Sequence, residues 1–253
     1  MALEKILDAF SGYLRHEIEE GRGRVDLDPA TLNALRNPQP AAPPTPKQAT
    51  SNAATVKTRD SMQAIARNVE ACTRCELCKT RTRSVPGQGS QQPEIAFIGD
   101  GPGQDEDQQG QAFVGRAGEL LTKMINAMGY TRDDVWIGNI VKCRPPNDRM
   151  PTDKEIETCI AHAKAQLAIL QPKVIICLGA TATKALLGTS LDITALRGQW
   201  QSYDGIDVMP TFHPELLLRD ATSAETKQAK RNTWEDLQAV LKKLGRPLPV
   251  RGK

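Results

Sequence analysis

The first twenty residues carry apolar side chains at helical spacing: Leu3, Ile6, Leu7, Phe10, Leu14 and Ile18. This pattern predicts one amphipathic helix over residues 1–21. Residues 22–60 follow as a Pro/Ala-rich linker, which we expect to be disordered. A lone helix of this length is marginal in water, so we expect helix 1–21 to dock on the rest of the chain or to bind a protein partner.

Beyond residue 60, short apolar runs alternate with amphipathic segments. The apolar runs predict strands at 94–100, 134–143, 173–179 and 206–214. The amphipathic segments predict helices at 115–130, 152–172, 180–188 and 227–245. Such alternation, with nearly continuous apolar strands, is typical of a parallel sheet covered by helices on both faces. We therefore expect one α/β domain over residues 61–253.

The carboxyl ends of parallel strands are where such a sheet binds ligands. Three of the four predicted strands end in polar or unusual residues: the glycine-rich stretch 99–103, Asn139 and His213. Asn139 would either clamp the fold or read the edge of a planar ligand, because an amide needs both a donor and an acceptor. His213 is either a structural histidine or a catalytic one. Phe113 is either a core residue or a stacking platform for a base.

Two further stretches bear on the kind of ligand. Pro102 and the acidic residues 105–107 follow the glycines of 99–103, which argues against a loop that binds a nucleotide phosphate. The three leucines at 216–218 follow His213 in an expected loop. They either begin a buried helix or form an exposed apolar tip, which would contact a partner or wedge between bases.

Composition narrows the class of protein. Of the 253 residues, 39% are hydrophobic and 25% are charged, and the net charge is only +3. No apolar run reaches the length of a membrane span, and acidic residues interrupt the N-terminal apolar pattern, so no signal peptide is expected. We therefore expect a cytoplasmic protein without a membrane partner. In that compartment six cysteines indicate ligands or buried thiols rather than disulfides.

Three of the cysteines follow one another at three-residue intervals, at 72, 75 and 78. The spacing indicates a metal or cluster site, yet three thiolates leave a tetrahedral or cubane site one ligand short. Residues 72–83 also carry four basic side chains against Glu76 alone. Such a cluster suits a polyanion, although a solvated surface is the ordinary interpretation of a charge run.

Five stretches together resemble one known family: GDGPGQDEDQQGQAFVGRAGELL (99–121), NIVKCRPPNDRMP (139–151), LGATATKALLG (178–188), RGQW (197–200) and TFHPELLLRD (211–220). In order and spacing they are similar to the family 4 uracil-DNA glycosylases, over roughly residues 61–240. The resemblance implies a three-layer α/β/α sandwich with a four-stranded parallel sheet and a [4Fe–4S] cluster. It also implies a DNA repair enzyme that flips deoxyuridine out of DNA, hydrolyses its N-glycosidic bond, releases uracil and leaves an abasic site.

The resemblance further assigns roles to residues of the predicted site. Asp100 and Gly101 would border the sugar and the attacking water, and the family usually has Glu in place of Asp100. Glu106 would fill the space beside uracil C5 and exclude the methyl group of thymine. Phe113 would stack on the flipped base, and Asn139 would read its edge.

The remaining roles concern the leaving group and the DNA stack. The resemblance implies that His213 donates to uracil O2 and stabilises the developing anion. Leu217 would be the wedge that fills the space left by the flipped nucleotide. A basic insert that carries a covalent histidine in another branch of the superfamily is absent after the second strand, so we expect ordinary turnover.

The family's ligand pattern also completes the cysteine site. It implies that Cys72, Cys75, Cys143 and Cys159 hold the cluster, while Cys78 is a bystander and Cys177 a buried strand residue. Spacing alone leaves zinc open as an alternative to iron–sulfur. We expect a monomer that acts on uracil-containing DNA, single- or double-stranded. The alternative is a non-catalytic or redox-active iron–sulfur DNA-binding protein on the same fold.

Overall fold

The computed structural model describes residues 51–220 and 222–248, with side chains from residue 61 onward. The predicted helix 1–21 and the linker up to residue 50 lie outside the described residues. The chain divides into two units, Met1–Ala49 and Thr50–Lys253. Helix α3 (Ser51–Glu70) begins inside the segment expected to be a disordered linker, so the predicted boundary at residue 61 falls within a helix.

A six-stranded sheet forms the centre of the second unit, in the order β1-β3-β2-β4-β6-β5. Its four central strands are parallel: β3 (Trp136–Asn139), β2 (Ile95–Gly99), β4 (Val174–Leu178) and β6 (Ile206–Thr211). They correspond to the four predicted strands. Two short antiparallel strands at the edges were not predicted: β1 (Gln88–Gly89) and β5 (Gln201–Tyr203).

The strand register brings the carboxyl ends level with one another. Gly99 of β2 pairs with Asn139 of β3, and Leu178 of β4 pairs with Thr211 of β6. Because the four strands are parallel, the loops that follow them emerge at one edge of the sheet. This edge carries the residues singled out in the sequence.

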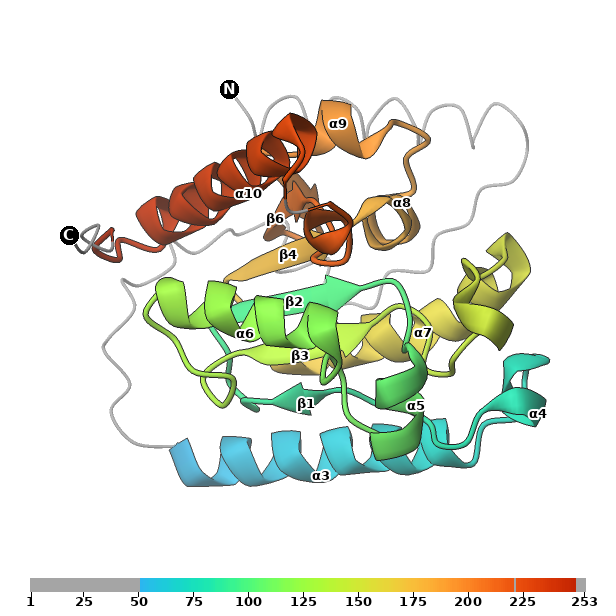
Figure 1. The fold of residues 1–253 in the computed structure, drawn as a ribbon. Helices are drawn as coiled ribbons and strands as arrows, with labels where there is room; N and C mark the ends of the chain where they lie inside the picture. The colour runs from blue at the N-terminus through green and yellow to red at the C-terminus, as the bar shows by residue number, and fades with distance from the viewer. Residues whose placement is uncertain (1–50, 221, 249–253) are drawn as a thin grey trace, which may run out of the picture. The chain divides into compact units, whose positions relative to one another are not determined.

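Helices cover both faces of the sheet, because successive side chains of each strand point to opposite faces. Ile95 and Phe97 belong to a core shared with α6 (Arg116–Ala127) and α10 (Ala224–Lys243). Ala96 and Ile98 belong to a second core shared with α3, α7 (Asp153–Leu170) and α8 (Ala180–Leu187). Figure 1 shows the helices around the sheet. The predicted three-layer α/β/α architecture is confirmed.

The connections contain short helices that the hydrophobic pattern did not indicate: α4 (Leu77–Thr80), α5 (Gln104–Gln109), η1 (Pro146–Asp148), α9 (Ile193–Leu196) and η2 (Leu216–Leu218). In α5 the backbone N–H of Gly103 donates to Glu106, so the capping interaction stabilises a turn that has no apolar face.

Among the described residues, no helix has the length and apolar character needed to cross a bilayer.

Candidate active site and cysteine cavity

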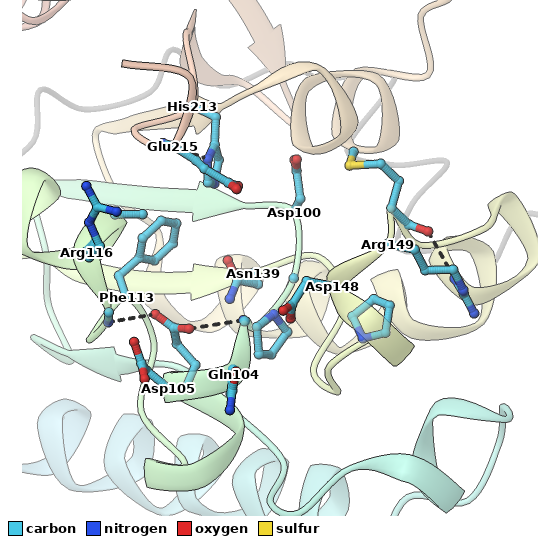
Figure 2. Close-up of a pocket in the computed structure, with 18 of the residues that line it drawn as sticks. Asp100, Gln104, Asp105, Phe113, Arg116, Asn139, Asp148, Arg149, His213 and Glu215 are labelled. Carbon is cyan, nitrogen blue, oxygen red and sulfur yellow. Dashed lines mark hydrogen bonds between the residues drawn. The ribbon is translucent and has the colours of Figure 1, made fainter. Parts of the chain in front are cut away.

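A cavity of roughly 500 Å³ opens at the carboxyl edge of the parallel strands. This volume lies in the range of pockets that hold small ligands. The cavity brings together six of the residues predicted from the sequence: Asp100, Gly101, Glu106, Phe113, Asn139 and His213. Figure 2 shows Asn139 in the middle of this group, with Phe113 on one side and Asp100 on the other.

Asn139 ends β3 and is only 1% exposed. Its Oδ1 atom is buried and has no hydrogen-bond partner among the described residues. An unpaired buried amide oxygen costs about 1–3 kcal/mol, so a ligand that donates to it recovers this free energy. Asn139 therefore has the character of a ligand-reading residue rather than of a structural clamp.

Phe113 lies beside Asn139 because Gly99 leaves room for both side chains. A Cβ atom at Gly99 would come within 2.5 Å of Phe113 Cζ and 2.6 Å of Asn139 Oδ1. Phe113 has a φ of 54°, in the left-handed region, which a non-glycine residue adopts only when its surroundings hold it there. Its ring centroid is 5.8 Å from that of His213. Two aromatic side chains thus face one side of the cavity.

Asp100 follows β2, and its carboxylate is held by the first turn of α8. Oδ1 accepts a hydrogen bond from the backbone N–H of Ala182 at 2.8 Å, and the side chain of Thr181 also hydrogen-bonds the carboxylate. Burial raises the pKa of Asp100 above its usual value, although His213, when protonated, and the two hydrogen bonds oppose this shift. The result is a fixed carboxylate that is a stronger base than an ordinary aspartate.

His213 follows β6 and faces the same cavity. Its Nδ1 atom accepts a hydrogen bond from the backbone N–H of Glu215 at 3.2 Å. Burial lowers the pKa of the imidazole below its usual value, and the charges of Asp100 and Glu106 oppose this shift. A neutral ring whose Nδ1 is an acceptor carries its proton on Nε2. His213 is therefore arranged to donate a hydrogen bond from Nε2.

Glu106 is buried and holds the loop that presents Phe113. Its Oε1 accepts hydrogen bonds from the backbone N–H groups of Val114 and Gly115, at 2.9 and 3.1 Å, and its Oε2 accepts from Gly103 at 3.1 Å. The carboxylate thus joins the first turn of α5 to the start of α6. Its predicted place beside uracil C5 stays a prediction.

Leu217, the predicted DNA wedge, is buried in this structure. Leu217 is only 2% exposed and packs in the core beneath α10, so it cannot reach into a DNA stack. The three leucines form the 3-10 helix η2, in which Leu217 is buried and Leu216 packs against the same core. Leu218 is half-buried and lines the cavity, so it replaces Leu217 as the candidate wedge.

A buried ion pair that the sequence reasoning missed supports the end of β6. Arg197 and Asp236 form a salt bridge, and Thr211 Oγ1 donates to Asp236 at 2.6 Å. Thr211 lies two residues before His213, so the ion pair fixes the strand from which the histidine emerges. The RGQW stretch was noted in the sequence, but nothing in it pointed to Asp236, which lies 39 residues away.

Arginines surround the mouth of the cavity, and they fall into two groups. Arg116 and Arg219 line the cavity and form no ion pair with a described residue. Arg149 is instead bound to Glu155 by two hydrogen bonds, at 2.7 and 2.8 Å. Arg116 and Arg219 can therefore bind a phosphate, whereas the guanidinium of Arg149 is already bound to Glu155.

A separate small cavity gathers the cysteines. It is lined by all four predicted ligands and by one more thiol: Cys72, Cys75, Cys143, Cys159 and Cys78. Cys177 is fully buried in β4 and does not line it. The folded chain therefore joins thiols from the turn after α3, from the end of β3 and from α7. Among the described residues, no three His, Cys, Asp or Glu side chains are grouped closely enough to hold a single metal ion.

Positive groups lie against these thiols. Arg81 Nη1 donates to Cys143 Sγ at 3.0 Å, and the backbone N–H of Lys142 donates to Cys159 Sγ at 3.3 Å. The Lys142 side chain is fully buried, and its Nζ donates to Gln166 Oε1 at 2.7 Å. Burial raises the pKa of both thiols, that of Cys159 to about 11, and these donors oppose the shift by favouring the thiolate.

Comparison with known proteins identifies the family to which this fold belongs. The family model described as the uracil DNA glycosylase superfamily matches residues 86–238. The chain is 42% identical to a type-4 uracil-DNA glycosylase of Thermotoga maritima, over 73% of this chain and 96% of the relative. It is 40% identical to the type-4 enzyme of Archaeoglobus fulgidus, over 63% of this chain and 84% of that protein. With the type-4 enzyme of Sulfurisphaera tokodaii the identity is 43%, over 63% and 76% of the two chains. This chain belongs to the uracil-DNA glycosylase superfamily, among its type-4 members.

Proposed function

We propose that this protein hydrolyses the N-glycosidic bond of deoxyuridine in DNA, releasing uracil and leaving an abasic site. One observation carries the proposal most directly. The buried Oδ1 of Asn139 has no hydrogen-bond partner among the residues that the structure describes, and it lies beside the ring of Phe113 in a cavity of base-binding size. The names of the type-4 relatives support the same activity.

Uracil fits the hydrogen-bonding capacity of Asn139. Its N3–H would donate to Oδ1, and its O4 would accept from the Nδ2 amide of the same side chain. Cytosine presents an acceptor at N3 and a donor at N4, so it would leave the amide badly paired. Phe113 would stack on the base face, because its ring borders the space in front of Asn139.

The leaving group is a uracil anion with negative charge on O2. His213 would donate its Nε2 proton in a hydrogen bond to that oxygen as the charge develops. The ring needs no protonation for this role, since the neutral tautomer already carries the proton on Nε2. A low pKa keeps the imidazole neutral at physiological pH.

Asp100 would act on the sugar side of the bond. As the C1′–N1 bond breaks, its electron pair stays on uracil N1 and C1′ becomes cationic. The carboxylate of Asp100 would stabilise this cation and accept a proton from the water that attacks C1′. The hydroxyl joins C1′, and the proton passes on to solvent or to the departing base.

The base must leave the stack before it reaches this cavity, which costs a few kcal/mol in a duplex. Leu218 is placed to fill the vacated space, because it lies at the cavity mouth on η2. Arg116 and Arg219 would bind phosphates beside the flipped nucleotide. In this proposal, residues at the cavity mouth hold the DNA and the flipped nucleotide, and residues at the strand ends break the glycosidic bond.

For the cysteine cavity we propose a [4Fe–4S] cluster held by Cys72, Cys75, Cys143 and Cys159. Four cysteine thiolates are the usual ligands of such a cluster, and all four of these line one cavity. When bound, the cluster would supply structural bracing between α3, β3 and α7. None of the steps above uses it.

The direct test uses an oligonucleotide with one uracil and asks for alkali-labile strand breaks at that position. We expect cleavage by the wild-type protein and none in an oligonucleotide with thymine instead. Asn139→Ala and His213→Ala should each lose activity about a hundredfold or more. Asn126→Ala is the matched control, because Asn126 is an exposed amide on α6 outside the cavity. A folded protein that binds DNA but leaves it intact would instead support the non-catalytic alternative.

A further inference from the structure

Met150 is unusual among the apolar residues of the described chain. Its side chain is 59% exposed, although methionine ordinarily contributes to the core. It also lines the mouth of the cavity that holds Asn139 and His213. Single exposed apolar residues are common, but this one borders a binding site, where it can contact a ligand that covers the mouth.

The backbone that carries Met150 is held in place. Arg149 Nη1 donates to the carbonyl oxygen of Met150 at 3.0 Å, and the same guanidinium is bound to Glu155 at the start of α7. Pro151 follows, and Thr152 then caps α7. Because the loop is already ordered, the backbone at Met150 loses little conformational freedom when a partner covers it.

Met150 and Leu218 both line the cavity. The loop 144–151 follows β3 and η2 follows β6, and these strands form the two outer positions of the four parallel strands. Figure 2 shows Asp148 and Arg149 on the side of the cavity away from Arg116. Met150 and Leu218 therefore line one cavity from separate elements, which follow the two outer parallel strands.

We propose that Met150 is a second apolar contact with DNA, packing on the base stack next to the flipped nucleotide while Leu218 fills the vacated position. The inference rests on the proposed function, since a uracil in the cavity fixes where its neighbours lie. Bases along a strand are about 3.4 Å apart, so a base that flanks the uracil would lie within reach of the rim where Met150 is exposed. Methionine is among the side chains that proteins insert against unstacked base steps.

This role has a consequence that a structural role would not have. In duplex DNA, Met150 would stabilise the opened stack and lower the free energy of the flipped state. In single-stranded DNA the uracil is already largely unstacked, so the contact contributes little. The ratio of activity on duplex DNA to activity on single strands therefore measures the contribution of Met150 to opening the duplex.

The test compares Met150→Ala, Met150→Leu and wild type on a duplex and on the same uracil-containing strand alone. We expect Met150→Ala to lower kcat/KM about tenfold on the duplex and less than about twofold on the single strand. Met150→Leu should retain the duplex activity, because it keeps an apolar side chain of similar size. Leu191→Ala is the control: Leu191 is 56% exposed but does not line the cavity, so both activities should be unchanged.

A second measurement does not depend on turnover. A duplex with a non-hydrolysable uracil nucleoside and an adjacent 2-aminopurine reports unstacking as a rise in fluorescence on binding. Met150→Ala should show a smaller rise than wild type at saturating protein. Equal losses on both substrates, or an unchanged duplex-to-single-strand ratio, would overturn the assignment of Met150. Failure of wild type to release uracil from either substrate would instead overturn the proposed function.

Discussion

Asp100 Oδ1 accepts a hydrogen bond from the backbone N–H of Ala182 at 2.8 Å, although the two residues are 82 positions apart. Ala182 lies in the first turn of α8, where unpaired N–H groups and the helix dipole favour a negative charge. Burial nevertheless raises the pKa of Asp100 above the usual range. The hydrogen bond from α8 thus fixes the position of the Asp100 carboxylate, whereas burial in the cavity raises its pKa.

The first prediction concerns the acid limb of the pH profile. Because the pKa of Asp100 is raised, its carboxylate is lost at a higher pH than that of an ordinary aspartate. Activity should therefore fall, as pH decreases, before ordinary aspartates protonate. Thr181→Val removes a hydrogen bond that favours the charged form, so the limb should move to still higher pH, and Thr181→Ser should restore it. A limb that stays at the same pH in Thr181→Val would contradict this role.

The same residue should link activity to stability. A buried acid whose folded pKa is raised destabilises the folded state fully above the folded pKa, and this penalty shrinks to zero as pH falls from the folded pKa to the unfolded pKa. Asp100→Asn keeps an oxygen that can accept from Ala182 but removes the charge. We expect it to lose activity and to unfold at a higher temperature than wild type at pH 7. The difference in Tm should shrink toward acidic pH.

The second prediction tests the close approach at Gly99. A Cβ atom there would lie 2.5 Å from Phe113 Cζ and 2.6 Å from Asn139 Oδ1, which is well below the van der Waals contact distance. Gly99→Ala must therefore displace one or both side chains. We expect the free energy of unfolding to fall by about 1–3 kcal/mol and uracil excision to fall at least about tenfold. Gly138, on the neighbouring strand, is the matched control. Its Cβ atom would lie 3.3 Å from the nearest atom, Trp136 Nε1, so Gly138→Ala should have a smaller effect on both.

The extent to which the sequence predicted this fold follows from how each element is stabilised. The runs that became β2 and β4 are buried along their whole length, and burial is what a hydrophobic pattern reports. Strands β1 and β5 are two and three residues long and only partly buried. They form through backbone pairing with their neighbours, which leaves no pattern in the side chains.

The candidate site divides in the same way. Asn139 and His213 could be found because polar residues at the ends of apolar strands stand out against their surroundings. Leu217 and Leu218 could not be told apart, because the register of the 3-10 turn decides which of identical side chains faces inward. The pairing of Arg197 with Asp236 depends on α10 packing beside β6, and no local pattern records that contact.

The third prediction concerns the two unpaired arginines at the cavity mouth. If Arg116 and Arg219 bind phosphates, each replacement by alanine removes one displaced counterion. The slope of log Kd against log salt concentration should then decrease by about 0.7–0.9 for each variant. Arg231 on α10 is exposed and outside the cavity, so Arg231→Ala should leave the slope unchanged. Unchanged slopes for Arg116→Ala and Arg219→Ala would place the phosphate path elsewhere.

The last prediction concerns the cysteine cavity, where five thiols line a space that four ligands would fill. Cys159→Ser should abolish the visible absorbance and iron content of the purified protein, because a [4Fe–4S] cluster needs all four thiolates. Cys78→Ser should retain both, since Cys78 stands outside the proposed ligand set. Loss of iron in Cys78→Ser with retention in Cys159→Ser would reverse this assignment, and zinc without visible absorbance would replace the cluster by a single ion. Cys177→Ser separates these effects from folding: Cys177 is buried in β4 away from the cavity, so its replacement should lower Tm without changing the iron content of the folded protein.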